Sequence, residues 1–212
     1  MEESNKHLNT LHDIKQMMER SSRFISLSGW SGVAAGICAL IGAWFAHGVI
    51  GFNSGSLKSY ADLSNRPLTI WDYIGNRLFL IALFTFIAAF LLAFIFTYLR
   101  SRKNNTPIWG TTARRLMLNV TIPMIAGGMY LLKLIENGAY GLIAPGCLIF
   151  YGLALVNASK YTLDEVRYLG YGQIILGVLN CWAPGYGLYF WAAGFGILHI
   201  IYGVLMWRKY EK

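Results

Sequence analysis

The chain alternates long uncharged apolar runs with short polar segments. An α-helix needs about 20 apolar residues to cross a bilayer, and several runs reach that length. The longest uncharged run, Tyr168 to Trp207, is too long for one crossing and is interrupted at Ala183-Pro184-Gly185, so it predicts a helical hairpin. The pattern therefore predicts six transmembrane helices, at about residues 26–50, 78–99, 115–134, 139–158, 163–182 and 186–207.

Two polar segments flank this transmembrane region, which as a whole covers residues 24–207. In residues 1–23, apolar residues recur at helical spacing between polar ones, which predicts an amphipathic helix lying on the cytoplasmic face of the membrane. Residues 208–212 form a short basic tail. The predicted fold class is all-α: a polytopic membrane protein of six spans with an amphipathic amino-terminal helix.

The fifth span has the shortest apolar part, so hydropathy alone does not locate its start. Thr162-Leu163-Asp164-Glu165 resembles a helix amino terminus, in which the Thr162 side chain caps the first turn and Glu165 reaches back toward it. Both acids also favour the positive end of the helix. We therefore expect this helix to begin near Leu163, in the headgroup region.

Composition agrees with a membrane location. Hydrophobic residues make up 56% of the 212 residues, charged residues only 13%, and the mean hydropathy is +0.46. A soluble domain carries about a quarter charged residues. The three cysteines, Cys38, Cys147 and Cys181, lie in apolar runs without paired spacing, so they predict neither a disulfide framework nor a zinc site.

The net charge of +8 follows membrane topology. Four of the 18 Lys and Arg residues lie on one side of the predicted spans, at Lys58, Arg66, Arg77 and Lys133, and the remaining 14 lie on the other. Lys and Arg concentrate in cytoplasmic loops. We therefore expect both termini in the cytoplasm and no nucleic-acid partner.

Glycine and polar residues mark the helix faces that point inward. Helices in lipid associate through small residues, so Gly29, Gly32, Gly36, Gly177 and Gly196 are predicted packing positions. The Gly32-x-x-x-Gly36 spacing allows close approach to a neighbouring helix or to a second copy of the chain, which leaves a homo-oligomer open.

Three polar side chains are predicted to lie at similar depth inside the bundle. At about 1.5 Å per residue, Gln173 and His199 fall at equal depth on the two hairpin helices, with Tyr151 near the middle of the fourth span. Asn119 and Tyr130 lie on the predicted inward face of the third span. Two interpretations stay open: these residues are packing residues that satisfy one another's hydrogen bonds, or they bind a ligand.

The predicted spans lack the residues that most catalytic mechanisms need. A protease dyad of Cys147 and His199 would have to bridge roughly 10 Å of depth, and the histidines are placed at different depths, which disfavours bis-histidine haem. No Asp or Glu lies inside a predicted span, which disfavours ion-coupled transport. We predict no catalytic residue, no metal site and no cofactor.

Three stretches carry a resemblance to a known family. They are Met17 to Phe24 followed by Leu27-Ser28-Gly29, then Phe150 to Thr162, and finally His199-Ile200-Ile201-Tyr202-Gly203. They resemble an uncharacterised family of small six-span bacterial integral membrane proteins. The resemblance implies a multi-span protein of the bacterial inner membrane and assigns no functional residue.

The expected function is a non-catalytic bundle in the inner membrane. It would bind a small apolar or lipid ligand, or a membrane or cytoplasmic protein partner, in a sensory, regulatory or accessory role. The site would be the inward face around Tyr151, Gln173 and His199. The alternative is a passive permease or channel for a small solute, and a membrane-embedded enzyme is the third interpretation.

Overall fold

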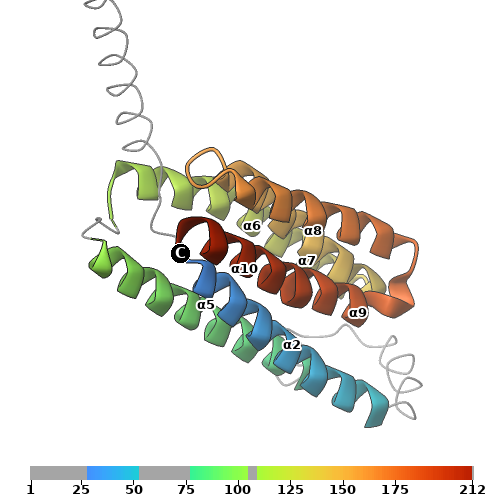
Figure 1. Ribbon diagram of the computed structural model, residues 1–212. Helices are drawn as coiled ribbons and strands as arrows, with labels where there is room; N and C mark the ends of the chain where they lie inside the picture. Colours follow the sequence, from blue (N-terminus) through green and yellow to red (C-terminus); the bar gives the residue numbers. More distant parts are fainter. Residues whose placement is uncertain (1–27, 53–76, 105–108, 212) are drawn as a thin grey trace, which may run out of the picture.

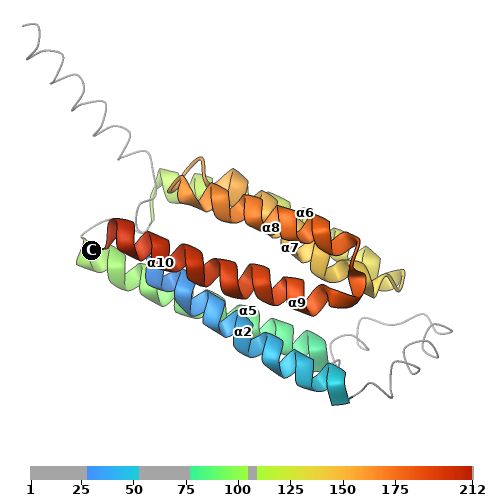
Figure 2. The same ribbon diagram turned by 45° about the vertical axis from the view of Figure 1, so that its right-hand side comes forward.

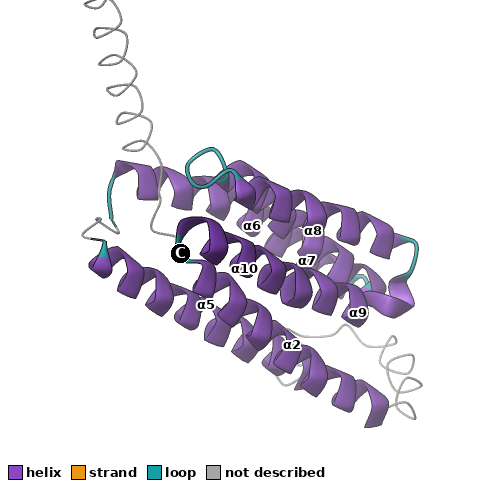
Figure 3. Cartoon of the chain, viewed as in Figure 1, coloured by secondary structure: helices purple, strands orange, loops and turns teal. Residues whose placement is uncertain are grey.

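The computed structural model describes residues 28–52, 77–104 and 109–211. In these ranges the chain consists of helices joined by short turns, without a strand (Figure 1, Figure 3). The predicted all-α class is therefore confirmed for the described residues. In chain order the elements are α2 (Gly29–Phe52), α5 (Arg77–Lys103), α6 (Thr111–Glu136), η2 (Tyr140–Leu142), α7 (Ile143–Ala158), α8 (Glu165–Cys181), η3 (Pro184–Tyr186), α9 (Gly187–Trp191), η4 (Ala192–Leu198) and α10 (His199–Tyr210). The predicted helix in residues 1–23 and the last residue of the basic tail lie outside the described residues.

Five helices of the described chain are long and apolar enough to cross a membrane, as expected of an integral membrane protein. They are Gly29–Ile50, Arg77–Lys103, Thr111–Glu136, Tyr140–Ala158 and Gly187–Tyr210, the last of which joins α9, η4 and α10. The remaining long helix, α8, has 17 residues and extends about 25 Å, somewhat less than a typical hydrocarbon core. It packs beside α7 in the same bundle.

The helices lie roughly side by side in three groups (Figure 1, Figure 2). The pair α2 and α5 forms one side, and α6, α7 and α8 form the other, with α7 contacting both of its neighbours. The last helix, from α9 to α10, lies between the two sides and contacts α2, α7 and α8. The carboxyl-terminal helix is thus the central element of the bundle.

Glycine allows α2 and α10 to approach until their backbones touch. A Cβ atom on Gly29 would lie 2.5 Å from the carbonyl oxygen of Gly203, and one on Gly203 would lie 2.6 Å from that of Gly29. Gly36 faces the carbonyl of Gly196 in the same way, at 2.6 Å, and Gly32 lies against Gly203. The Gly32-x-x-x-Gly36 face is therefore occupied within the chain.

A second glycine contact joins α7 to α8. Gly152 and Gly170 face each other, and a Cβ atom added to either one would lie within 2.8 Å of the other's carbonyl oxygen. Gly177, one of the predicted packing residues, lies against Leu148 and Ile149 about two turns further along α8. Close backbone approach of this kind stabilises helix pairs through van der Waals contact, which matters in lipid because the hydrophobic effect contributes little between helices.

The outer surface of the bundle is apolar, with aromatic residues toward both ends. Helix α5 buries only Ser101 and exposes a series of phenylalanines, as expected of a helix that faces lipid. Exposed Trp and Tyr side chains lie near the two ends of the bundle, where such residues meet the membrane–water interface. They include Trp44, Trp182, Tyr186 and Tyr189 near one end, and Trp109, Tyr168 and Tyr210 near the other.

Candidate functional site

Three helices bring Tyr151, Gln173 and His199 together inside the bundle. Tyr151 comes from α7, Gln173 from α8, and His199 is the first residue of α10. The hydroxyl of Tyr151 lies 2.9 Å from Nε2 of His199, and Nε2 of Gln173 lies 3.4 Å from its Nδ1. Gln173 is completely buried and His199 nearly so. We call these three residues the polar core cluster.

The carbonyl of Gly194 organises the polar core cluster. Residues Ala192–Leu198 form a π-helical segment, a wider turn that often occurs at functional sites. The Gly194 oxygen accepts hydrogen bonds from Nε2 of Gln173 at 2.8 Å and from Nδ1 of His199 at 3.0 Å. With its proton on Nδ1, His199 accepts the Tyr151 hydroxyl proton at Nε2. Both ring nitrogens of His199 are therefore satisfied by the protein.

Aromatic rings enclose one side of the polar core cluster. The ring of Phe195 lies 5.1 Å from that of Tyr151 and 6.0 Å from that of His199, measured between centroids. Trp191 extends the aromatic contact, 5.1 Å from Phe195. Phe195 and Trp191 were not predicted site residues, although each lies four residues from the next aromatic ring of this row, a spacing that places side chains on one helix face.

Gln173 is the member of the polar core cluster with an unused hydrogen-bonding atom. Its Oε1 is buried and accepts no hydrogen bond from the described residues. Oε1 points toward Gly194, where a Cβ atom would lie 2.6 Å away, so a side chain at this position would displace the amide. A buried acceptor without a donor is costly in an apolar environment. Oε1 is thus the acceptor of the polar core cluster that has no described donor.

The other two predicted binding residues lie elsewhere, on α6. Asn119 accepts hydrogen bonds from Nδ2 of Asn157 on α7, at 2.9 Å to its backbone oxygen and 3.3 Å to its side-chain oxygen. Tyr130 is half exposed and its ring packs on Phe150. Neither residue contributes a described contact to the polar core cluster, because α6 packs mainly against α7.

At the end of the bundle where α8 begins, Glu165 binds the last helix. Its Oε1 accepts hydrogen bonds from Lys209 and from the Tyr210 hydroxyl, the latter at 2.8 Å. Lys209 and Glu165 thereby form an ion pair between α10 and α8. The predicted helix start was wrong in its details: α8 begins at Glu165, and its cap position is Asp164 rather than Thr162.

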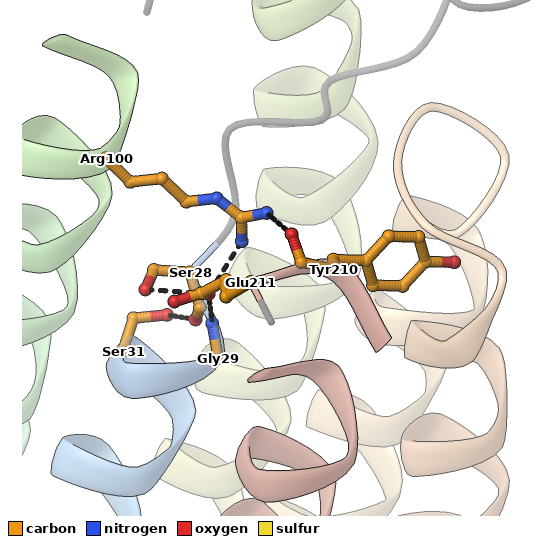
Figure 4. A network of polar contacts seen from close by, with 6 residues as sticks. All are labelled: Ser28, Gly29, Ser31, Arg100, Tyr210 and Glu211. Atoms are coloured by element: carbon orange, nitrogen blue, oxygen red, sulfur yellow. Dashed lines mark hydrogen bonds and ion pairs between the residues drawn. The ribbon is translucent and has the colours of Figure 1, made fainter. Parts of the chain in front are cut away.

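A second polar network, shown in Figure 4, lies at the same end of the bundle. Oε1 of Glu211 accepts hydrogen bonds from Arg100 at 2.8 Å, from the Ser28 hydroxyl at 3.1 Å and from the backbone nitrogen of Gly29 at 2.6 Å. Arg100 also donates to the Tyr210 carbonyl. We call this network the terminal clamp, since it joins the start of α2 and the end of α5 to the residue that follows α10. Nothing in the spacing of these residues along the sequence predicts the terminal clamp.

The described residues offer little for catalysis or metal binding. They contain no group of three or more His, Cys, Asp or Glu side chains that could hold a metal ion. The described hydrogen bonds of the His199 ring go to Tyr151 and to the Gly194 oxygen, and no cysteine or serine is among its partners. The arrangement suits hydrogen bonding to a guest molecule better than nucleophilic chemistry.

Comparison with known proteins found no matching family model, no similar curated protein and no similar solved structure. The resemblance to a family of small bacterial membrane proteins stays a prediction.

Proposed function

We propose that this protein is a non-catalytic membrane protein that binds a small ligand at the polar core cluster. The proposal rests on the buried Oε1 of Gln173, an acceptor that receives no hydrogen bond from the described residues. Gln173 lies beside His199, the residue that follows the π-helical segment. Natural proteins rarely bury such an atom without a use for it. A bound molecule with a hydroxyl or amine group would supply the missing donor.

The surroundings of Oε1 define the chemistry of this ligand. Phe195 offers an aromatic face beside Tyr151 and His199, and Leu148 is completely buried beside Gly194. Apolar walls with a few polar groups are typical of small-molecule sites. We therefore propose a small, largely apolar ligand with one hydrogen-bond donor, and a lipid-derived alcohol or amine would satisfy both requirements. The role in the cell would be sensory, regulatory or accessory.

We further propose the complete topology of six spans in a bacterial inner membrane, with both termini in the cytoplasm. In support, α8 runs beside α7, and most described Lys and Arg residues cluster where α5 and α10 end. The exposed residues Lys160 and Arg102 belong to this end, whereas Arg77 and Lys133 belong to the other. Sealed vesicles with cysteine reporters at Lys160 and Lys133 would test the orientation.

Substitution of Gln173 tests the ligand site directly. Native mass spectrometry of the protein, released from its own membrane in mild detergent, is expected to show a defined small-molecule adduct. Gln173→Met removes the acceptor at similar volume and leaves a ligand donor unpaired, which costs about 1–3 kcal/mol. Retention should therefore weaken by roughly tenfold or more.

The matched control for this experiment is Tyr130→Phe, because Tyr130 is a half-exposed aromatic residue away from the polar core cluster. It should leave the adduct unchanged, whereas Tyr151→Phe should reduce it by releasing His199 Nε2. A wild-type protein without any adduct, or an adduct that Gln173→Met leaves intact, would contradict the proposal.

A passive permease is the second candidate, and Asn180 favours it. Asn180 is completely buried on α8, seven residues beyond Gln173, and its Oδ1 also lacks a hydrogen-bond donor among the described residues. Buried acceptors thus continue along one side of α8 toward the opposite end of the bundle. Liposome swelling with small neutral solutes should then be severalfold slower with Asn180→Leu than with wild type. Equal rates for liposomes with and without the protein would exclude this candidate.

A further inference from the structure

Four buried side-chain oxygens lack a hydrogen-bond partner among the described residues, and all four belong to α8 or α10. They are Oε2 of Glu165, Oε1 of Gln173, Oδ1 of Asn180 and the hydroxyl oxygen of Tyr202. Such atoms are uncommon in proteins, and each calls for a physical reason. Asn180 lies toward the opposite end of α8, whereas the other three lie toward the end that carries Lys209, which indicates a shared cause for these three.

Three of these oxygens lie in a row that leads from the end of the bundle where α5 and α10 end into its interior. Glu165 is the first residue of α8, and Gln173 lies two turns deeper, about 12 Å along the helix. Tyr202 lies between them on α10, one turn from His199, and packs on Leu163, Val166 and Met206. It is within electrostatic range of both Glu165 and Tyr151. We call Glu165, Tyr202 and Gln173 the polar seam.

The hydrogen-bonding capacities along the polar seam match those of water. The carboxylate oxygen of Glu165 and the amide oxygen of Gln173 only accept, while the Tyr202 hydroxyl can both donate and accept. No described protein donor reaches any of them. A water molecule donates two hydrogen bonds and accepts others, so a short file of waters would satisfy all three oxygens at once. Apolar surroundings make the unsatisfied arrangement especially unfavourable.

We propose that the polar seam is hydrated and connects the polar core cluster with the aqueous phase at the end of the bundle that carries Lys209. Glu165, held by Lys209 and Tyr210, lies at its entrance. The seam ends at Gln173, so water reaches the neighbourhood of His199. The seam shares Oε1 of Gln173 with the proposed ligand site: water donates to this oxygen when no guest is bound, and the donor group of a guest replaces that one water without emptying the rest of the seam.

Hydroxyl-radical footprinting of the wild-type protein in lipid nanodiscs tests the proposal. Radicals formed from ordered water modify aromatic side chains next to it, and mass spectrometry of peptides reports the modified residue. Tyr202 is expected to be modified strongly although it is only partly exposed. The control is Phe90, in the middle of α5, which is 56% exposed in the protein and faces lipid.

Modification of Tyr202 well above that of Phe90 supports a hydrated seam, and modification no greater than that of Phe90 overturns it. Because the measurement uses the unaltered chain, its failure cannot be attributed to misfolding. It also leaves the ligand proposal standing, since adduct retention is measured separately.

Cysteine accessibility identifies the side from which water enters. In a chain with its three native cysteines replaced by alanine, Tyr202→Cys should react with a membrane-impermeant thiol reagent from the same side as Lys160→Cys. Lys160 is exposed in the turn before α8. Val204→Cys, two residues along α10 and exposed to lipid, should not react. Equal reactivity at the 202 and 204 positions, or reaction only from the opposite side, would overturn the proposed route.

Discussion

The free energy of unfolding is expected to fall by about 1–3 kcal/mol when Glu211 is replaced by alanine, because three donors lose the acceptor of their hydrogen bonds. Side-chain exposure is only 10% for Arg100 and 16% for Glu211. Glu211→Ala removes the carboxylate oxygen that accepts hydrogen bonds from Arg100, from the Ser28 hydroxyl and from the Gly29 backbone nitrogen. Reversible unfolding in mixed micelles would measure the loss.

Glu136→Ala is the matched control for this substitution. Glu136 forms an ion pair with Lys133 at 2.5 Å, but exposure is 73% for the lysine and 55% for the glutamate. Exposed pairs of this kind contribute about 0–1 kcal/mol. If both substitutions destabilise the protein equally, the terminal clamp has no special role.

A double-substitution cycle separates the ion pair from the other contacts of Glu211. If Arg100 and Glu211 act together, the Arg100→Ala and Glu211→Ala changes made jointly should cost clearly less than their separate costs combined. The additional cost of Glu211→Ala in a chain that already carries Arg100→Ala would measure the bonds of Glu211 to Ser28 and Gly29. Additive costs would show that the pair contributes nothing beyond its separate members.

The terminal clamp illustrates what the sequence could not predict. Hydropathy placed residues 208–212 in a basic tail, and Glu211 attracted no attention there because the sequence gives no indication of its partner. Arg100 lies 111 positions earlier in the chain. A charge pair over that separation becomes visible only when the ends of α5 and α10 are known to meet.

The helices themselves were more predictable, because the length of each apolar run can be read from the sequence. The ends of α5, of α7 and of the last helix, which runs from α9 to α10, fall within a few residues of the predicted spans. The start of α8 was predicted two residues early, since Thr162 and Glu165 matched a capping pattern although Glu165 binds Lys209 and Tyr210 instead. The contact of Glu165 with α10 thus replaces the predicted local contact with Thr162.

Depth along the helices predicted part of the candidate site. Equal depth on hairpin helices suggested that Gln173 and His199 meet, and in the structure both hydrogen-bond to the carbonyl of Gly194. The π-helical turn that presents this carbonyl has no signature in the spacing of apolar residues. Tyr130 shows the opposite case: its position on the inward face was inferred from polarity alone, and the residue is half exposed.

Glycine-to-alanine changes are expected to divide by location, and Gly203→Ala should be among the most damaging. Its Cβ atom would lie 2.6 Å from both the Gly29 oxygen and the Val33 nitrogen, which are backbone atoms that cannot move aside. Overpacking typically costs about 1–3 kcal/mol, and the backbone contact favours the upper part of that range. Unfolding in mixed micelles measures this loss as well.

Gly128→Ala provides the contrast within the same chain. A Cβ atom at this position would meet nothing within 4 Å, although Gly128 is also inside a long helix. Alanine is favoured over glycine in a helix interior by about 1 kcal/mol, so this variant should be unchanged or slightly more stable. Because the two changes add the same methyl group, opposite signs would assign the damage at Gly203 to the contact between α2 and α10. Equal losses would instead mean that this contact does not limit stability.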